Sequence, residues 1–393
     1  MTDGIEELLR SGPPIPDEAP AQVDDFLRRV RSGARRKRRR QRVAWTAGLG
    51  ATAVAATVAG VVLSVIPHQA PTQQHQAFLH TTKVPAAVPG RTVSFSASAP
   101  DRWWVLSAIR CPEFPTGCAV VSGSAMPQYV RVGAPAPRHF YDETAHTVGD
   151  VRFAVDGTDG WAYGGALWST HDGGRSWHQV SLPEGTTVQS VAAYGTRVYA
   201  LVQHAGGQPG VLTTATANDD WTPLPVPAGL SETGSQLVVA RGVPAFAAYD
   251  TVRRERAIVL SHDGGRTWTV RRSPCGTATL AATGSSLWAT CQADAHGAVY
   301  ASRDGHSWTR VGAVALGEGA QLAPRDSGST LVYLGRRAAL LDDSGSHPVD
   351  VGLRSGELIR YAGFNDPSHG FVLTSYGRLL TSTDGGHTWT QLD

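Results

Sequence analysis

The chain is poor in lysine, cysteine and methionine. Lys37 and Lys83 are its only lysines among 35 basic residues, and its 393 residues include 4 cysteines and 2 methionines. The C-x-x-C spacing of structural zinc sites does not occur, so the cysteines do not predict a metal centre. Beyond residue 42 the chain carries 24 basic and 26 acidic side chains, which excludes a polybasic nucleic-acid-binding domain.

Positive charge is concentrated in one short segment near the N-terminus. Residues 1–42 hold 11 basic and 7 acidic side chains, and residues 43–66 then follow without any charge. At 1.5 Å per residue this second segment reaches roughly 36 Å, enough to cross a bilayer. We expect a transmembrane helix over 43–66, because the apolar core of a cleaved signal peptide is shorter.

The positive-inside rule then places residues 1–42 in the cytoplasm and the long C-terminal part outside, as in a single-pass protein of the cell membrane. From composition we expect residues 1–42 to be largely disordered, with either a short helix on the inner leaflet or a docking helix for a cytoplasmic partner. We expect residues 67–100 to form a flexible extracytoplasmic linker. An even number of cysteines outside the cytoplasm predicts disulfides, and proximity pairs Cys111 with Cys118 and Cys275 with Cys291.

A stretch of eight or nine residues ending in tryptophan recurs between residue 169 and the C-terminal region. "STHDGGRSW" ends at Trp177, "LSHDGGRTW" at Trp268, "ASRDGHSW" at Trp308 and "TSTDGGHTW" at Trp389. Two decayed copies lie between them. One keeps the tryptophan, as Trp221, and the other has Pro348 in its place. The intervals are then 44, 47, 40, 40 and 41 residues, close to the length of one propeller blade.

Each interval contains short apolar strands bounded by Gly, Asp and Ser, which is typical of an antiparallel all-β array. Six units of four strands fit residues 149–393, and a seventh without the repeat fits 103–147. The sequence therefore predicts an all-β domain over 101–393. The expected architecture is a seven-bladed β-propeller of four-stranded antiparallel blades, preceded by a single transmembrane helix. The sequence does not decide between six and seven blades or show how the ring closes.

The repeat resembles the Asp-box, or BNR, motif of sialidases, sortilin-type receptors and photosystem II assembly-factor propellers. The resemblance implies that the motif is the turn between the third and fourth strands of a blade. An aspartate there accepts backbone N–H bonds, glycine supplies positive φ, and the tryptophan packs between blades. We therefore expect structural turns rather than acids, bases or calcium ligands at the box residues, which are Asp172, Trp177, Asp263, Trp268, Asp304, Trp308, Asp384 and Trp389.

The sequence is compatible with two functions, a binding propeller and a glycoside hydrolase. The resemblance to sialidases implies an arginine triad and an "R-I-P" segment, and no "R-I-P" occurs in this chain. We therefore expect a propeller without catalytic residues that binds a protein, peptide or cell-wall glycan as a scaffold or sensor, with no cofactor and no metal. An exo-sialidase-like glycoside hydrolase is the alternative.

The innermost strands of the predicted blades carry arginines that could converge on the central channel and bind an anionic ligand. The opposite possibility is that they pair with local aspartates at blade edges. Tryptophans inside strands are expected to form the core between blades, and a sugar or peptide platform is the alternative use. The candidate ligand-binding residues are Arg110, Arg152, Arg241 and Arg360, and the tryptophans in question are Trp103, Trp104, Trp161, Trp168 and Trp288.

Overall fold

The computed structural model describes residues 91–111, 114–124, 126, 128–135, 147–205, 207–231, 236–275, 278–291, 297–317 and 319–392. The predicted cytoplasmic segment 1–42, the predicted membrane span 43–66 and most of the predicted linker lie outside these residues. Within the described ranges, no helix is long and apolar enough to cross a membrane.

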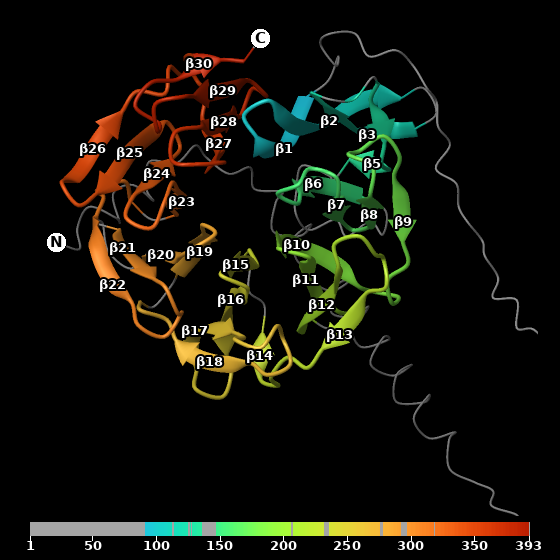
Figure 1. The fold of residues 1–393 in the computed structure, drawn as a ribbon, viewed down its shortest axis with the longest axis horizontal. Helices are drawn as coiled ribbons and strands as arrows, with labels where there is room; N and C mark the ends of the chain where they lie inside the picture. The colour runs from blue at the N-terminus through green and yellow to red at the C-terminus, as the bar shows by residue number, and fades with distance from the viewer. Residues whose placement is uncertain are drawn as a thin grey trace, which may run out of the picture. The chain divides into compact units, whose positions relative to one another are not determined.

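Seven sheets stand around a common centre, as expected for a seven-bladed propeller (Figure 1), and all their strand pairs are antiparallel except β5 with β6. The first four sheets contain, in chain order, β1 (Arg91–Ala99), β2 (Arg102–Cys111), β3 (Phe114–Gly123) and β4 (Val130–Arg131); β5 (Ala134–Pro135), β6 (Thr147–Phe153), β7 (Gly160–Gly164), β8 (Leu167–Thr170) and β9 (His178–Val180); β10 (Thr187–Tyr194), β11 (Arg197–Gln203), β12 (Pro209–Ala215) and β13 (Thr222–Leu224); and β14 (Leu230–Ser231), β15 (Val238–Ala240), β16 (Val243–Asp250), β17 (Glu255–Leu260) and β18 (Thr269–Arg272).

The last three sheets have four strands each. They contain β19 (Ala278–Ala282), β20 (Leu287–Cys291), β21 (Ala298–Ser302) and β22 (Thr309–Ala313); β23 (Gln321–Pro324), β24 (Thr330–Leu334), β25 (Arg337–Asp342) and β26 (Gly345–Val349); and β27 (Ile359–Phe364), β28 (Gly370–Thr374), β29 (Leu379–Ser382) and β30 (Thr390–Gln391). Strands β6, β10, β19, β23 and β27 surround the centre, and β9, β13, β18, β22, β26 and β30 lie at the periphery (Figure 1).

Each sheet contains a meander of four consecutive antiparallel strands, so the turns between them alternate between two faces of the ring. The second sheet adds β5, which pairs with β6 in parallel, and the fourth adds β14, which pairs with β16. Turns from first to second strand and from third to fourth strand share one face, which we call the box face. Contacts between neighbouring sheets agree with this arrangement, because Arg241 N donates to Gly284 O from one first turn to the next. Trp104 Nε1, beside the first turn of its sheet, donates to Gly173 O in a third turn.

The core lies between adjacent sheets, where apolar side chains of one sheet pack on the next. Trp161 and Tyr163 of the second sheet pack against Val191 and Ala200 of the third. Trp104, Trp161 and Trp288 are at most 1% exposed, so they belong to the core between sheets and present no open platform.

The first sheet differs from the prediction. Residues 91–99, which the sequence analysis placed in a linker, form β1, and "WWVLSAIR" therefore lies in the second strand and not the first. The period-2 pattern of "RTVSFSASA" places serines between small apolar residues, and this weak signal has no box to mark it. The pairing of Cys111 with Cys118 would consequently join β2 to β3; the side chain of Cys111 lies outside the described residues, so the pairing stays a prediction.

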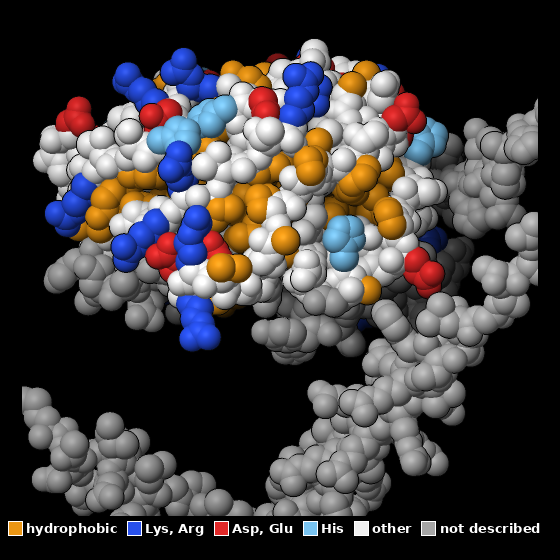
Figure 2. All heavy atoms as spheres, turned by 90° about the horizontal axis from the view of Figure 1, so that it is seen from below, with side chains coloured by type: hydrophobic (Ala, Val, Ile, Leu, Met, Phe, Trp, Pro, Cys, Tyr) orange, Lys and Arg blue, Asp and Glu red, His pale blue; other side chains and the backbone are white. Residues whose placement is uncertain are grey.

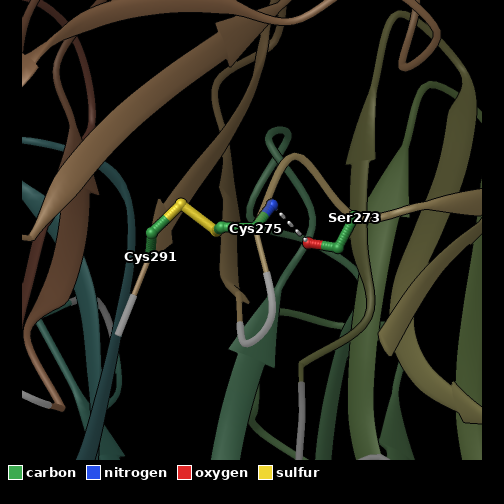
Figure 3. The surroundings of a disulfide bond; sticks show 3 residues. All are labelled: Ser273, Cys275 and Cys291. Atoms are coloured by element: carbon green, nitrogen blue, oxygen red, sulfur yellow. Dashed lines mark hydrogen bonds between the residues drawn. A yellow bond between two sulfur atoms is a disulfide. The ribbon is translucent and has the colours of Figure 1, made fainter. Parts of the chain in front are cut away.

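A disulfide joins Cys275 to Cys291, which confirms the second predicted pair (Figure 3). The two Cα atoms lie 5.7 Å apart, within the usual range for a disulfide. Cys291 ends β20, and Cys275 lies in the segment that enters β19. The bond therefore ties this connecting segment to the neighbouring strand.

The ring closes between the last sheet and the first without a shared strand, since β1 to β4 come from the beginning of the domain and β27 to β30 from its end. Side chains make this junction. Phe95 of β1 and Phe371 of β28 have ring centroids 4.4 Å apart, and Phe371 also stacks on Tyr361 of β27 at 5.9 Å. Aromatic packing therefore replaces backbone pairing at the closure.

Candidate functional site

The four box turns lie between the third and fourth strands of their sheets, and each is organised by its aspartate. In the turn after β17, Asp263 Oδ1 accepts hydrogen bonds from Thr267 N at 2.9 Å and from Ser261 Oγ at 2.8 Å. Ser261 Oγ in turn accepts a bond from Gly265 N at 2.7 Å. Gly264 and Gly265 have φ of 73° and 93°, a region that favours glycine.

The other three turns repeat this pattern. Asp172 accepts from Ser176 N, Asp304 from Ser307 N and Asp384 from Thr388 N, at distances of 2.8 to 2.9 Å. The tryptophan of each of these turns donates its indole N–H to a glycine carbonyl of the same turn. Trp177 donates to Gly174 O, Trp308 to Gly305 O and Trp389 to Gly386 O. These carboxylates are occupied by the backbone of their turns, so the geometry gives them a structural task.

The hydrogen bonds also stabilise the charged form of these carboxylates. Bonds from the Thr267 backbone and side chain lower the pKa of Asp263 to about 2, and similar bonds lower the pKa of Asp304 and Asp384. For Asp172, burial raises the pKa but the bonds from Ser176 and Thr170 outweigh it.

A lowered pKa in the folded state makes the turn's contribution to stability depend on pH. The Asp263 contribution should be complete above its unfolded value of 3.8 and should be lost as the pH falls toward about 2. We expect Asp263→Asn to lower the urea midpoint at pH 7 and to leave a smaller loss at pH 2.5. Equal losses at both pH values would contradict this account of the turn.

A second group of polar residues, which we call the channel cluster, lies on first and second strands of four sheets. It consists of Ser94 of β1, Asp150 and Arg152 of β6, Tyr163 of β7, Tyr333 of β24 and Tyr361 of β27. The Arg152 guanidinium lies 4.9 Å from the centre of the Tyr361 ring, although the first sheet stands between their sheets. Side chains from inner strands that are not neighbours can come into contact only at the centre of the ring, so Arg152 and Tyr361 both reach it.

Asp150 is the centre of the hydrogen bonds in the cluster. Its carboxylate accepts bonds from Tyr163 Oη at 2.7 Å and from Ser94 Oγ, and its own Oδ1 accepts Val151 N at 2.8 Å. Burial and the nearby Asp150 charge raise the pKa of Tyr163, so its phenol keeps its proton. These bonds leave Asp150 well satisfied before any contact with the arginine.

Arg152 is held more loosely. Its Nη2 atom lies 3.6 Å from Asp150 Oδ2, beyond ordinary hydrogen-bond range, and 22% of its side chain is exposed. Burial lowers the pKa of this arginine, but Asp150 and the tyrosines outweigh that effect and raise it. The guanidinium therefore stays charged, with the Tyr361 ring beside it and Asp150 Oδ2 beyond ordinary hydrogen-bond distance of its Nη2 atom.

Two of the four arginines predicted for the channel lie elsewhere. Arg110 is exposed on β2, a second strand, and Arg241 occupies the turn after β15 with φ of 54°. Arg360 is exposed on β27 next to Tyr361. Of the four predicted arginines, Arg152 and Arg360 thus lie on innermost strands. Arg110 and Arg241 do not, because β2 is a second strand and β15 ends at Ala240.

The sequence analysis missed the tyrosines of the cluster. Tyr163, Tyr333 and Tyr361 lie in apolar strands, where a tyrosine is as well suited to the core as a leucine or valine. Their meeting with Arg152 depends on ring closure, which local patterns do not encode. The "VRF" and "IRY" segments, at equivalent points of two first strands, could have indicated that Arg152 and Tyr361 meet.

Charged side chains are spread over the outer edge of the ring. Figure 2 shows arginines interspersed with acidic residues and histidines, with apolar side chains between them. This side of the molecule therefore presents no continuous surface of one charge, and the channel cluster is the more defined candidate site.

The chain matches no protein-family model and no curated protein. Among solved structures, a chain of the mitotic checkpoint complex is 12% identical over 84% of this chain and 99% of that chain, with a TM-score of 0.52. The Pan2 WD40 domain of Neurospora crassa is 10% identical over 75% and 89%, with a TM-score of 0.51. YCF48 bound to a D1 peptide is 19% identical over 65% and 86%, with a TM-score of 0.46. The protein is thus similar to β-propellers in fold.

Proposed function

We propose that the protein is a binding propeller without catalytic residues, and that Arg152 in the channel cluster binds an anionic group of a protein, peptide or cell-wall glycan. The observation that carries the proposal is the position of the Arg152 guanidinium, 4.9 Å from the Tyr361 ring centre and with Nη2 3.6 Å from Asp150 Oδ2. Arginine donors suit carboxylates, and an aromatic ring beside them adds a flat apolar surface for a sugar or side chain. Propellers serve many functions, so the site and not the fold supports this assignment.

The same cluster argues against the hydrolase alternative. Sialidases use a tyrosine nucleophile, and other glycosidases need two free carboxylates about 5 to 9.5 Å apart. Tyr163 is 3% exposed with a raised pKa, so it is a poor source of phenolate. Asp150, its carboxylate partner, is occupied by hydrogen bonds from Tyr163 and Ser94.

The site is tested by calorimetry with tri-galacturonate and an acetylated tetraglutamate peptide, with maltotriose as a neutral control. We expect at least one anionic probe to bind the wild-type chain, and roughly 10- to 100-fold weaker binding to Arg152→Gln, since a charge-assisted hydrogen bond contributes about 1.5–3 kcal/mol. Arg241→Gln, outside the cluster, should bind like the wild type. Equal affinity of Arg152→Gln and the wild type would end the proposal.

We propose further that the propeller is tethered to the outer side of the cell membrane through residues 43–66. The support is the uncharged segment directly behind a basic one. Reporter fusions should place residue 30 in the cytoplasm and residue 100 outside. Release of the whole propeller into the medium would show a cleaved signal instead.

A further inference from the structure

Two positions of the box motif meet across the boundary between neighbouring sheets. His171 lies six residues before Trp177 in the second sheet, and Asp219 lies two residues before Trp221 in the third. His171 Nε2 is 3.5 Å from Asp219 Oδ2. The equivalent positions of the fourth and fifth sheets hold His262 and His306, whose rings stack at 4.7 Å.

The second nitrogen of His171 is already fixed. His171 Nδ1 lies 2.8 Å from Asp159 Oδ1, and the Asp159 side chain is only 7% exposed. A carboxylate accepts hydrogen bonds, so this contact assigns a proton to Nδ1. A histidine oriented by a buried carboxylate is the usual arrangement behind a metal-binding imidazole.

The free nitrogen of His171 has no hydrogen bond among the described residues. Nε2 is buried, and Asp219 Oδ2 lies too far away for a normal hydrogen bond. With the proton on Nδ1, the Nε2 lone pair faces a carboxylate, which is unfavourable unless a positive species lies between them. Ser169 Oγ donates to Asp219 Oδ2 at 2.8 Å and holds this oxygen in place.

We propose that His171 and Asp219 bind one divalent transition-metal ion of the Zn²⁺ class between the second and third sheets, with Asp159 as the positioning residue. Zinc binds imidazole nitrogen and carboxylate oxygen at about 2.0–2.2 Å in tetrahedral geometry, so two of its ligands lie roughly 3.4 Å apart. The 3.5 Å separation of Nε2 and Oδ2 matches this value. The described residues hold no group of three or more ligating side chains, so solvent completes the coordination and the affinity is modest.

Asp219, the acid of this pair, belongs to the decayed box of the third sheet. The position of Asp219 is occupied by Arg175, Arg266, His306 and His387 in the four intact boxes. An acid at this position faces the histidine of the preceding sheet across the boundary. Loss of the regular motif thus coincides with a new pair of metal-compatible groups.

The test is zinc titration of the full chain in detergent, freed of metal with EDTA, by calorimetry and thermal unfolding at pH 7. We expect zinc to raise the Tm by about 5 °C at 100 times its Kd. His171→Ala and Asp219→Ala should lose this rise, and Asp159→Asn should bind zinc roughly 10- to 100-fold more weakly. His262→Ala is the matched control at the other boundary and should keep the response.

The unfolding of each variant in EDTA shows that it is folded before zinc is added. Asp219 is 36% exposed at its side chain, so its replacement by alanine disturbs the core little. A proton in place of the metal would leave the wild-type chain without a zinc response, which would overturn the proposal. An unchanged zinc response in both His171→Ala and Asp219→Ala would overturn it as well.

Discussion

Replacing Glu357 by alanine is expected to destabilise the protein by about 3–5 kcal/mol, because it leaves the largely buried Arg378 without its carboxylate partner. Glu357 is fully buried, and its Oε2 accepts Arg378 Nη1 at 2.6 Å and Arg354 N at 2.8 Å. Thr374 Oγ1 donates to the other oxygen. One carboxylate therefore joins the segment before β27 to the end of β28 and to the turn that leads into β29.

The same bonds give the effect a pH dependence. Burial raises the pKa of Glu357, but Thr374, the Arg354 backbone and Arg378 outweigh it and lower the pKa. Its contribution is therefore complete above the unfolded value of 4.5 and is lost as the pH falls below it.

Urea unfolding at pH 7 measures the loss. Glu184→Ala, an exposed glutamate in another loop, is the control and should change stability by no more than about 0.5 kcal/mol. Similar stabilities for Glu357→Ala and Glu184→Ala would show that the last sheet does not depend on this ion pair.

Trp177→Ala should have a comparably large effect, about 3–5 kcal/mol, because it opens a cavity between the first and second sheets. Trp177 is 2% exposed and meets Phe153 edge-on at 5.8 Å. Phe153 in turn stacks on Trp104 at 3.6 Å, and Trp104 Nε1 donates to the box carbonyl of Gly173. The box turn is therefore part of the packing between sheets as well as a connection within one.

Trp221 offers a matched comparison in the decayed box of the third sheet. It is only partly buried, and its indole nitrogen has no hydrogen-bond partner among the described residues. Trp221→Ala should cost about half as much as Trp177→Ala in thermal or urea unfolding. A larger loss at Trp221 would mean that the intact box is not what anchors these tryptophans.

The repeat carried most of the fold prediction. Trp177, Trp268, Trp308 and Trp389 are regularly spaced, and a box turn has to be short, glycine-rich and closed by an aspartate, so local sequence specifies it almost completely. The first sheet has no such marker, and β1 was therefore assigned to the linker.

The channel cluster could not be read from the sequence to the same extent. Arg152 was identified because a charge in an apolar strand is conspicuous, whereas Tyr361 was not, since tyrosine is common in strands. Their contact joins strands near opposite ends of the propeller and exists only once the ring has closed. Arg241 was predicted at the end of a first strand, but β15 ends at Ala240 and Arg241 lies in the turn that follows.

We propose that the channel cluster binds the ligand, while the box turns hold the fold. Hydrogen exchange followed by mass spectrometry, with and without the anionic probe that binds, tests it most directly. We expect added protection in peptides covering 147–153 and 359–364, which contain Arg152 and Tyr361, and unchanged exchange in the box turn 261–268. Protection confined to the box turns, or to the outer strands β9, β13 and β18, would contradict the account.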